Sequence, residues 1–420
     1  MTSRVFPAAG GGAHAARVRQ ELLAGAGAGT AGSSGAGAAA LAAAVHRTGL
    51  PSGGAAALSA VEAARRELVG AGALEPLLAD PGVTDVLVNG PHEVWVERDG
   101  LLSRVELSLG HEDDVRRLAV RLAAAAGRRL DDAAPFVDVR LPDGSRLHAV
   151  LPPVSPSGTL LSIRVLRHRA LSLDDLVGSG SLDPLLGTLL RCLIAARLSV
   201  VVTGGTGTGK TTLLGALLDV VPAAERLVVA EDACELRTHH EHVVRLECRT
   251  ANVEGAGEVS LRDLVRQARR MRPDRLIVGE ARGAEIVDLL TALNVGSEGG
   301  LTTLHANSAA DLPARLAALA ALAGMAPGAI EPLAAAGLHA VVHLRRRGGR
   351  REVAEVATVG LLRSTSGRAD LQVRLALAPG GVVGCGGPAL LQSLRECGVE
   401  PPAELATALA TALEQAPGAL

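Results

Sequence analysis

Hydrophobic and polar positions divide the chain into segments of different periodicity. Residues 1–54 show almost no apolar period and are dominated by alanine, glycine and serine, so we predict a low-complexity, flexible segment there. Over residues 55–170, short alternating runs such as "VTDVLVNG" and "EVWVERDG" lie between Gly-containing turns and helical patterns. This mixture predicts an α+β N-terminal domain that contains a hairpin turning at residues 142–144.

A different pattern begins at residue 171. Continuous apolar runs, among them "SVVVTG", "RLVVAED", "DRLIVGE" and "GGLTTLH", alternate with helical segments as far as residue 362. Continuous apolar strands between helices are typical of a largely parallel sheet that is covered on both faces. We therefore predict an α/β domain over residues 171–362, with a hairpin at Gly348 and Gly349. A C-terminal tail with two short helices, residues 363–420, is expected to follow.

The composition and charge of the chain argue against several classes of protein. The formal net charge is −2, which gives no global bias toward nucleic acid or an acidic membrane. The five cysteines have neither CxxC pairing nor tight spacing, which favours a reduced, cytosolic protein over a disulfide framework. No apolar run reaches the roughly 18 residues of a membrane span. We expect a cytoplasmic protein.

Lysine occurs once in the chain, at Lys210, although lysine and arginine together number 42. We interpret this skew, and the absence of tyrosine, as coding pressure from a GC-rich genome, under which a surviving rare residue is a candidate for chemical necessity. Lys210 stands in "GGTGTGKT", which matches G-x-x-x-x-G-K-[ST] between an apolar strand and a helix. Glycines there let backbone N–H groups face phosphate oxygens, and a compact ammonium reaches phosphates where a planar guanidinium would not fit.

The pattern thus predicts a nucleoside triphosphate site with Mg²⁺, whose ion the Thr211 hydroxyl ligates. We expect the following residues to bind ATP: Gly204, Gly205, Thr206, Gly207, Thr208, Gly209, Lys210, Thr211 and Thr212.

Acidic side chains and one histidine follow three other apolar strands. Glu280 ends the strand of "LIVGE", at the sheet edge where open α/β folds bind ligands, and it can hold the Mg²⁺ shell or orient water. The segment "VVAEDACEL" offers Glu231, Asp232 and Glu235, one of which could polarise the attacking water. His305 in "TTLHANS" could contact a phosphate or a carboxylate. The structural alternatives are helix N-terminal carboxylates for the acids and a satisfied structural histidine.

In their order along the chain, these blocks resemble the secretion ATPase superfamily of type II secretion, type IV pili and type IV secretion. The strongest resemblance is to Tad/Flp-type pilus assembly ATPases, known in actinobacteria as the Tad-family conjugal-transfer-associated ATPase. It runs from about residue 60 to 362 and includes "DVRLPDGSRLHAVLPPVSPSG", "TGGTGTGKTTLL", "AEDACEL" and "TTLHANS". Its most specific part is the block that ends in "RPDRLIVGEARGAE".

The resemblance implies a RecA-like P-loop domain preceded by a smaller N-terminal domain, with nucleotide between the two. It implies an ATP-hydrolysing homo-hexamer, peripheral to the cytoplasmic face of the inner membrane. The implied partners are a polytopic inner-membrane platform protein and a pilin-like or secreted substrate. We expect no direct nucleic-acid binding, because the chain has only three aromatic residues apart from histidine, Trp plus two Phe, with no interleaved basic and aromatic pattern.

The resemblance also assigns roles to single residues. The motif called the Asp box matches "EDACEL", which makes Glu235 the general base and Glu231 its neighbour. The atypical Walker B motif matches "LIVGE", so that Glu280 holds Mg²⁺ through water, and the His box carries His305. Two arginines of "DVRLPDGSR" reach the phosphates and neutralise charge in phosphoryl transfer, with ordinary hairpin charge as the alternative: Arg140 and Arg146.

One departure from the family pattern opens an alternative function. The His box usually begins with "TGH", whereas this chain has "NVGSEGG", with Val295 and Ser297. A nucleotide-binding scaffold with low turnover is therefore one alternative, and a RecA-like DNA translocase is another. Two weaker patterns also stay open: "HHEH" near Cys234 and Cys248 as a zinc site, and "RRRGGRR" as a lipid-binding or simply solvated hairpin tip.

Overall fold

The structure is a computed structural model of the 420-residue chain. It describes residues 65, 70–98, 100–165, 170–249, 256–296, 298–363 and 369–411. The segment expected at residues 1–54, and Ser297 in the His box, lie outside the described residues. The chain divides into two compact units, Met1–Arg167 and His168–Leu420.

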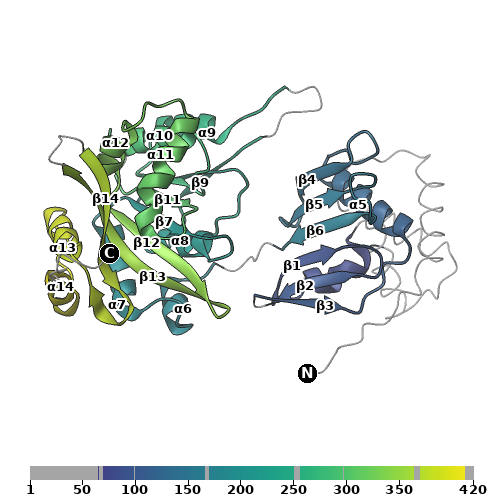
Figure 1. Ribbon diagram of the computed structural model, residues 1–420, viewed down its shortest axis with the longest axis horizontal. Coiled ribbons are helices and arrows are strands. Elements are labelled where there is room, and N and C mark those ends of the chain that lie inside the picture. The colour runs from purple at the N-terminus through teal and green to yellow at the C-terminus, as the bar shows by residue number, and fades with distance from the viewer. Residues whose placement is uncertain are drawn as a thin grey trace. The chain divides into compact units, whose positions relative to one another are not determined.

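The first unit is built on a six-stranded antiparallel sheet with the order β3-β2-β1-β6-β5-β4 (Figure 1). Helix α5, Glu112–Ala125, covers the sheet with Val115, Leu118 and Leu122, which recur at helical spacing and are buried in the core of this unit. The bounds of the strands and of the short helical segments before them are η1 Gly72–Leu74, α4 Glu75–Leu78, β1 Val83–Val88, β2 Val94–Arg98, β3 Leu101–Val105, β4 Phe136–Arg140, β5 Arg146–Val150 and β6 Leu160–Arg164.

The second unit contains a nine-stranded sheet with the order β15-β14-β13-β12-β7-β11-β10-β8-β9. Its strands are β7 Val200–Gly204, β8 Leu227–Glu231, β9 Val243–Glu247, β10 Arg275–Val278, β11 Leu301–Leu304, β12 Ala340–Arg347, β13 Arg350–Arg363, β14 Ala369–Ala378 and β15 Val382–Val383. The six strands from β12 to β9 are mutually parallel, and β13 to β15 continue the sheet in antiparallel fashion. A parallel sheet with the P-loop strand between β12 and β11 confirms the predicted RecA-like α/β class.

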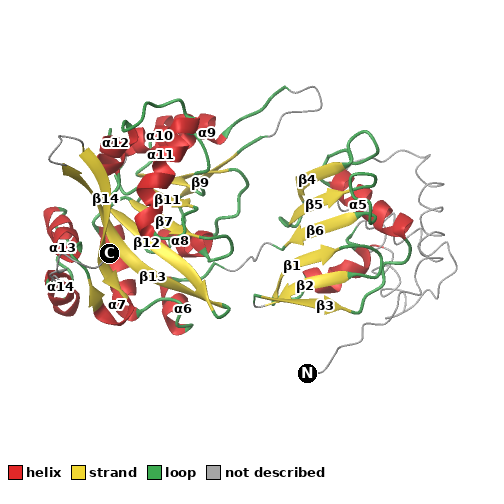
Figure 2. Ribbon diagram, in the orientation of Figure 1, coloured by secondary structure: helices red, strands yellow, loops and turns green. Residues whose placement is uncertain are grey.

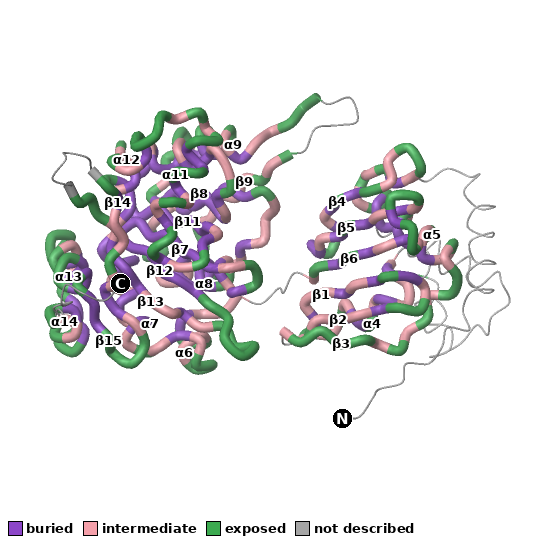
Figure 3. Tube along the Cα trace, viewed as in Figure 1, coloured by how far each residue is buried: buried purple, intermediate pink, exposed green. Residues whose placement is uncertain are grey.

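Helices cover both faces of this sheet (Figure 2). One core joins the sheet to α6, α7, α8, α13 and α14, and the other joins it to α9, α10, α11 and α12. Strand residues alternate between the two cores: Val200 and Val202 belong to the first, and Val201 belongs to the second. The central strands are buried along their whole length (Figure 3), as their continuous apolar runs predict.

The helices of the second unit are α6 Leu173–Gly178, α7 Pro184–Ala195, α8 Lys210–Leu218, α9 Leu261–Ala268, α10 Glu285–Leu293, α11 Leu312–Leu322, α12 Ile330–Gly337, α13 Gly387–Glu396 and α14 Ala403–Ala410, with 3₁₀ turns η2 Arg269–Met271, η3 Ala309–Asp311 and η4 Pro379–Gly381. Among the described residues, no helix is long and apolar enough to cross a membrane. In the segment expected as a tail, the described residues form β14, β15, α13 and α14.

Candidate nucleotide site

The predicted phosphate-binding loop connects β7 to α8. Gly204, Gly207 and Gly209 have φ angles of 151°, 72° and 97°, in the region that favours glycine. A Cβ atom at Gly204 would lie 2.6 Å from the carbonyl oxygen of Leu344 on the neighbouring strand β12. The Thr208 hydroxyl donates to the Gly205 carbonyl at 2.9 Å and closes the loop. The glycines are therefore required by backbone conformation and by close packing.

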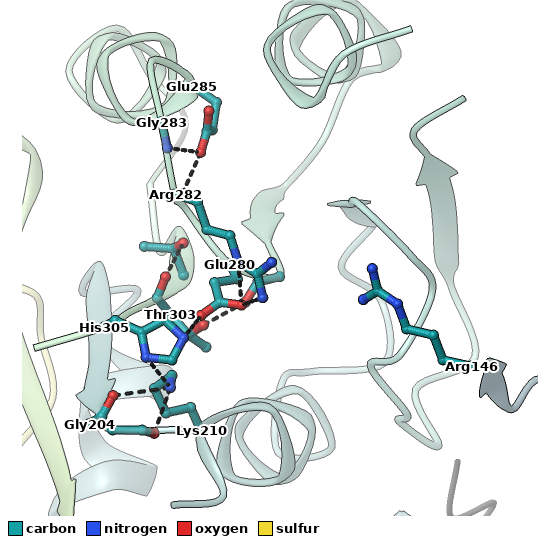
Figure 4. Close-up of polar contacts among 12 residues, drawn as sticks. Arg146, Gly204, Lys210, Glu280, Arg282, Gly283, Glu285, Thr303 and His305 are labelled. Atoms are coloured by element: carbon teal, nitrogen blue, oxygen red, sulfur yellow. Dashed lines mark hydrogen bonds and ion pairs between the residues drawn. The ribbon is translucent and has the colours of Figure 1, made fainter. Parts of the chain in front are cut away.

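Lys210 is the first residue of α8, and its ammonium group is buried within the loop (Figure 4). Its Nζ donates to the carbonyl oxygens of Gly204 at 3.0 Å and Gly205 at 2.9 Å, and it lies 3.4 Å from Nδ1 of His305. Burial lowers the pKa of Lys210, while the nearby charge of Glu280 acts in the opposite direction. The only lysine of the chain is thus held where the loop curls around it, and anionic phosphate oxygens are stronger acceptors than these carbonyls.

Glu280 and His305 meet beside this ammonium. Glu280 follows β10 and His305 follows β11, and β11 lies between β10 and the P-loop strand β7, so the three strand ends share one sheet edge. One carboxylate oxygen of Glu280 lies 2.5 Å from Nε2 of His305, and the other accepts from Nε of Arg282 at 2.8 Å. Desolvation lowers the pKa of His305 against the attraction of Glu280. The structure therefore brings together three predicted residues, Lys210, Glu280 and His305.

Glu231, at the end of β8, has a different place. Its side chain is buried, and Oε1 accepts the backbone N–H groups of Glu235 at 3.1 Å and Leu236 at 2.8 Å. Burial raises the pKa of Glu231. A Cβ at Gly279 would lie 2.6 Å from Cγ of Glu231, so this glycine makes room for it. Glu231 thus fixes the backbone on which the half-buried Glu235 stands.

The remaining predicted loop residues lie on the first turn of α8 and at the loop tip. Thr211 is half-buried, whereas Thr206 and Thr212 are exposed. Their role toward ATP and Mg²⁺ stays a prediction.

Arg140 and Arg146 belong to the first unit. They face each other across the predicted β4–β5 hairpin, which the structure confirms. Nε and Nη2 of Arg146 donate to the two carboxylate oxygens of Asp138 at 2.9 and 3.0 Å. Their role toward phosphate stays a prediction.

Two histidines of the segment "HHEH", after the Asp box, contact the chain that follows α8. Nδ1 of His239 lies 3.0 Å from a carboxylate oxygen of Asp219, directly after α8, and His240 contacts the Pro222 carbonyl at 3.1 Å. Within the described part of the chain, no group of three His, Cys, Asp or Glu side chains could hold a metal ion. These contacts favour anchoring of the Asp-box loop over a zinc site.

Gly215, inside α8, packs against the same loop. A Cβ there would lie 2.3 Å from the carbonyl oxygen of Arg237. Glycine within a helix usually costs about 0.5–1 kcal/mol relative to alanine, but a clash with backbone reverses that sign. We expect Gly215→Ala to lower the free energy of unfolding by about 1–3 kcal/mol, measured by urea denaturation.

The matched control is Gly178→Ala, because a Cβ at this helical glycine would meet no atom within 4 Å. Its stability is expected to equal or exceed that of the wild type. A Gly215→Ala protein as stable as this control would contradict the close approach of α8 and the Asp-box loop.

Comparisons with known proteins decide the family. The family model described as "Type II/IV secretion system protein" matches residues 67–359. The chain belongs to this family. Membership of the type II/IV secretion system protein family confirms the resemblance, and with the intact P-loop it classes the chain as a nucleotide-binding secretion ATPase.

Alignments with several known proteins cover about two thirds or more of the chain. A putative conjugal transfer protein of Mycobacterium tuberculosis is 53% identical over 309 residues, covering 72% of this chain and 87% of that protein. The conjugal transfer protein TrbB of Rhizobium radiobacter is 33% identical over 285 residues, and the alignment covers 66% of this chain and 84% of TrbB. The solved VirB11 ATPase of the Brucella suis type IV secretion system is 28% identical, covers 68% of this chain and 96% of its own, and has a TM-score of 0.36.

Two residues near the site carried no sequence signal of their own. Arg282 pairs with Glu280, and its position two residues later in "GEARGAE" was the available hint. His343, on β12, lies with Nδ1 3.0 Å from the Thr203 hydroxyl on β7, in a buried contact beside the loop. Burial lowers the pKa of His343. Its partner strand could not be known from the sequence.

Proposed function

We propose that the chain is an ATP-hydrolysing motor that powers Tad/Flp pilus assembly or a related secretion or conjugal transfer system. The observation that carries this proposal is the convergence of Lys210, His305 and Glu280 at the carboxyl ends of three adjacent parallel strands. An ammonium inside a glycine loop can bind a polyphosphate, and a carboxylate at the same sheet edge can hold Mg²⁺ or orient the water that hydrolyses it.

The donor set fits Mg²⁺, which prefers hard oxygen ligands. The Thr211 hydroxyl on α8 and the Glu280 carboxylate would hold the ion, Glu280 through water. Bound there, Mg²⁺ supplies charge neutralisation at the phosphates. Glu235 would act as general base toward the attacking water. Glu231 would position Glu235, because its carboxylate accepts hydrogen bonds from the backbone N–H groups of Glu235 and Leu236.

His305 would couple phosphate binding in the loop to the position of Glu280, because its two ring nitrogens contact Lys210 and Glu280. When phosphate oxygens bind the Lys210 ammonium, the contact between Lys210 and His305 would be lost. The imidazole ring could then move together with the Glu280 carboxylate, which it still contacts. Arg140 and Arg146 would add positive charge to the phosphates from the N-terminal domain, so that ATP binding draws the two domains together.

The assembly that we propose is a homo-hexamer at the cytoplasmic face of the inner membrane. It would act on a polytopic platform protein and move a pilin-like or secreted substrate. Support comes from family membership and from relatives named as conjugal transfer proteins. Sequential domain closure around a ring would convert hydrolysis into motion.

The test is steady-state ATP hydrolysis by the purified full-length chain with Mg²⁺, together with light scattering with and without ATP. We expect turnover that Lys210→Ala abolishes, and hexamers in solution. Equal rates for the wild type and Lys210→Ala would eliminate the motor and favour a scaffold. Salt-sensitive stimulation of turnover by DNA would favour a DNA translocase instead.

A further inference from the structure

The arginine-rich hairpin β12–β13 lies against the phosphate-binding loop. Strand β12 pairs in parallel with the P-loop strand β7, with Leu344 opposite Gly204. Beyond this point the hairpin continues to its turn at Gly348 and Gly349, whose φ angles are 57° and 84°. The turn agrees with the predicted hairpin. The base of the hairpin is therefore fixed beside the loop by the register of the sheet.

Arg351 makes the contact between hairpin and loop. Its Nε donates to the Gly207 carbonyl oxygen at 2.9 Å. A Cβ at Gly209 would lie 3.6 Å from Cδ of Arg351, so the side chain runs along the loop between these two glycines. Because neighbouring side chains of a strand point to opposite faces, Arg350 turns away, and its Nη2 donates to the Ser179 carbonyl at 3.3 Å.

The contact orients one peptide group of the loop. In a planar trans peptide the C=O and the following N–H point in opposite directions. The Gly207 carbonyl points to the Arg351 guanidinium, so the N–H of Thr208 points away from that guanidinium. Lys210 meanwhile holds the carbonyls of Gly204 and Gly205. Two cations thus fix three carbonyl groups of a loop whose function depends on where its N–H groups point.

Charge on the hairpin adds to this effect. Arg346 is directly opposite Arg351 in the antiparallel register, so both side chains leave the same face of the hairpin. Like charges in this position repel and lower stability. They also raise the positive potential next to a loop that receives a polyphosphate.

We propose that Arg351 is a nucleotide-positioning residue, which shapes the P-loop for the β-phosphate through the Gly207 carbonyl. This inference rests on the proposed ATPase function. Arg346 reinforces it by charge. A residue that pre-organises the binding site acts on ground state and transition state alike, so its loss raises Kd and KM and leaves kcat nearly unchanged.

The test compares Arg351→Ala with Arg350→Ala in the full-length chain. Both remove one positive charge from adjacent positions of the hairpin, but only the first touches the loop. We expect Arg351→Ala to raise the Kd for ADP and the KM for ATP about tenfold, with kcat within about twofold, because a charged hydrogen bond is lost. Arg350→Ala should change each value by less than about twofold, and AMP, which lacks the β-phosphate, should lose less affinity than ADP.

Arg351→Lys provides a second variant in which the charge is kept. It is expected to recover ADP affinity to within about threefold of the wild type, because an ammonium can also donate to the Gly207 carbonyl. Unchanged ADP affinity in Arg351→Ala, or equal losses in Arg350→Ala, would overturn the role of Arg351 and leave the ATPase standing. A wild-type chain that binds no nucleotide would overturn both.

Discussion

Lys210→Arg is expected to reduce ATP turnover by about 10²–10³-fold, although the charge is unchanged. The Lys210 ammonium is buried and lies between the carbonyls of Gly204 and Gly205 and the ring of His305. A guanidinium is a wide planar fork that needs more room than this loop leaves. The variant should therefore also bind ADP more weakly, which distinguishes it from a purely catalytic defect.

The measurement is kcat and KM for ATP, with Kd for ADP and the midpoint of thermal unfolding recorded on the same samples. Arg350→Lys is the matched control, because it makes a charge-preserving exchange of the opposite kind on the hairpin in the same unit. We expect this control to keep turnover within about twofold. If Lys210→Arg hydrolysed ATP at the wild-type rate, the rarity of lysine in this chain would have no bearing on its chemistry.

Glu280→Gln has the second-largest expected effect. The substitution removes the negative charge that contacts both His305 and Arg282 and that favours the charged form of Lys210. We expect kcat to fall about 10²-fold or more, since the carboxylate acts on Mg²⁺ and water during phosphoryl transfer. The affinity for ADP should stay within about threefold, because the glycine loop and Lys210 are intact.

Pre-steady-state hydrolysis and equilibrium ADP binding separate these two effects. Asp174→Asn is the control, because Asp174 also forms an ion pair with an arginine, Arg191, but lies on the exposed surface of α6. Its turnover is expected to equal that of the wild type. A Glu280→Gln protein with full kcat would assign the carboxylate a structural function and leave the acidic residues of the Asp box as the candidates for activating water.

Strand ends explain why most of the site could be predicted from sequence. A continuous apolar run followed by a glycine loop, a glutamate or a histidine places each polar residue at the carboxyl edge of a parallel sheet. Lys210, Glu280 and His305 were located in this way, and the structure brings them into contact. Local pattern suffices here because every parallel strand ends on the same side.

Packing between elements explains what the sequence left undetermined. Glu231 and Glu235 stand in the same motif, yet the side chain of Glu231 turns inward under Gly279 and binds backbone. Arg351 looked like one of several arginines at a solvated hairpin tip, and only the pairing of β12 with β7 brings it to the loop. Strand partners are fixed by tertiary contacts, which a single strand pattern does not encode.

The same limit applies to the C-terminal part of the fold. Strand β14 pairs with β13 in antiparallel fashion and extends the sheet beyond the P-loop domain as we bounded it, at residue 362. The run "LQVRL" alternates apolar and polar residues, as a half-buried strand does, and "ALA" continues it as an apolar stretch. Nothing local to that run says which strand it joins.

Because Lys210 is the only lysine of the chain, its ε-amino group can be used to follow nucleotide binding to the loop. Apart from the α-amino terminus, an acylating reagent finds one primary amine in the chain, and it stands at the bottom of the glycine loop. A nucleotide bound in the loop should slow the acylation of this buried amine, so the rate of acylation at Lys210 reports nucleotide binding without an engineered label. For the same reason, a reagent selective for lysine side chains has a single target in the chain, and that target lies in the proposed nucleotide site.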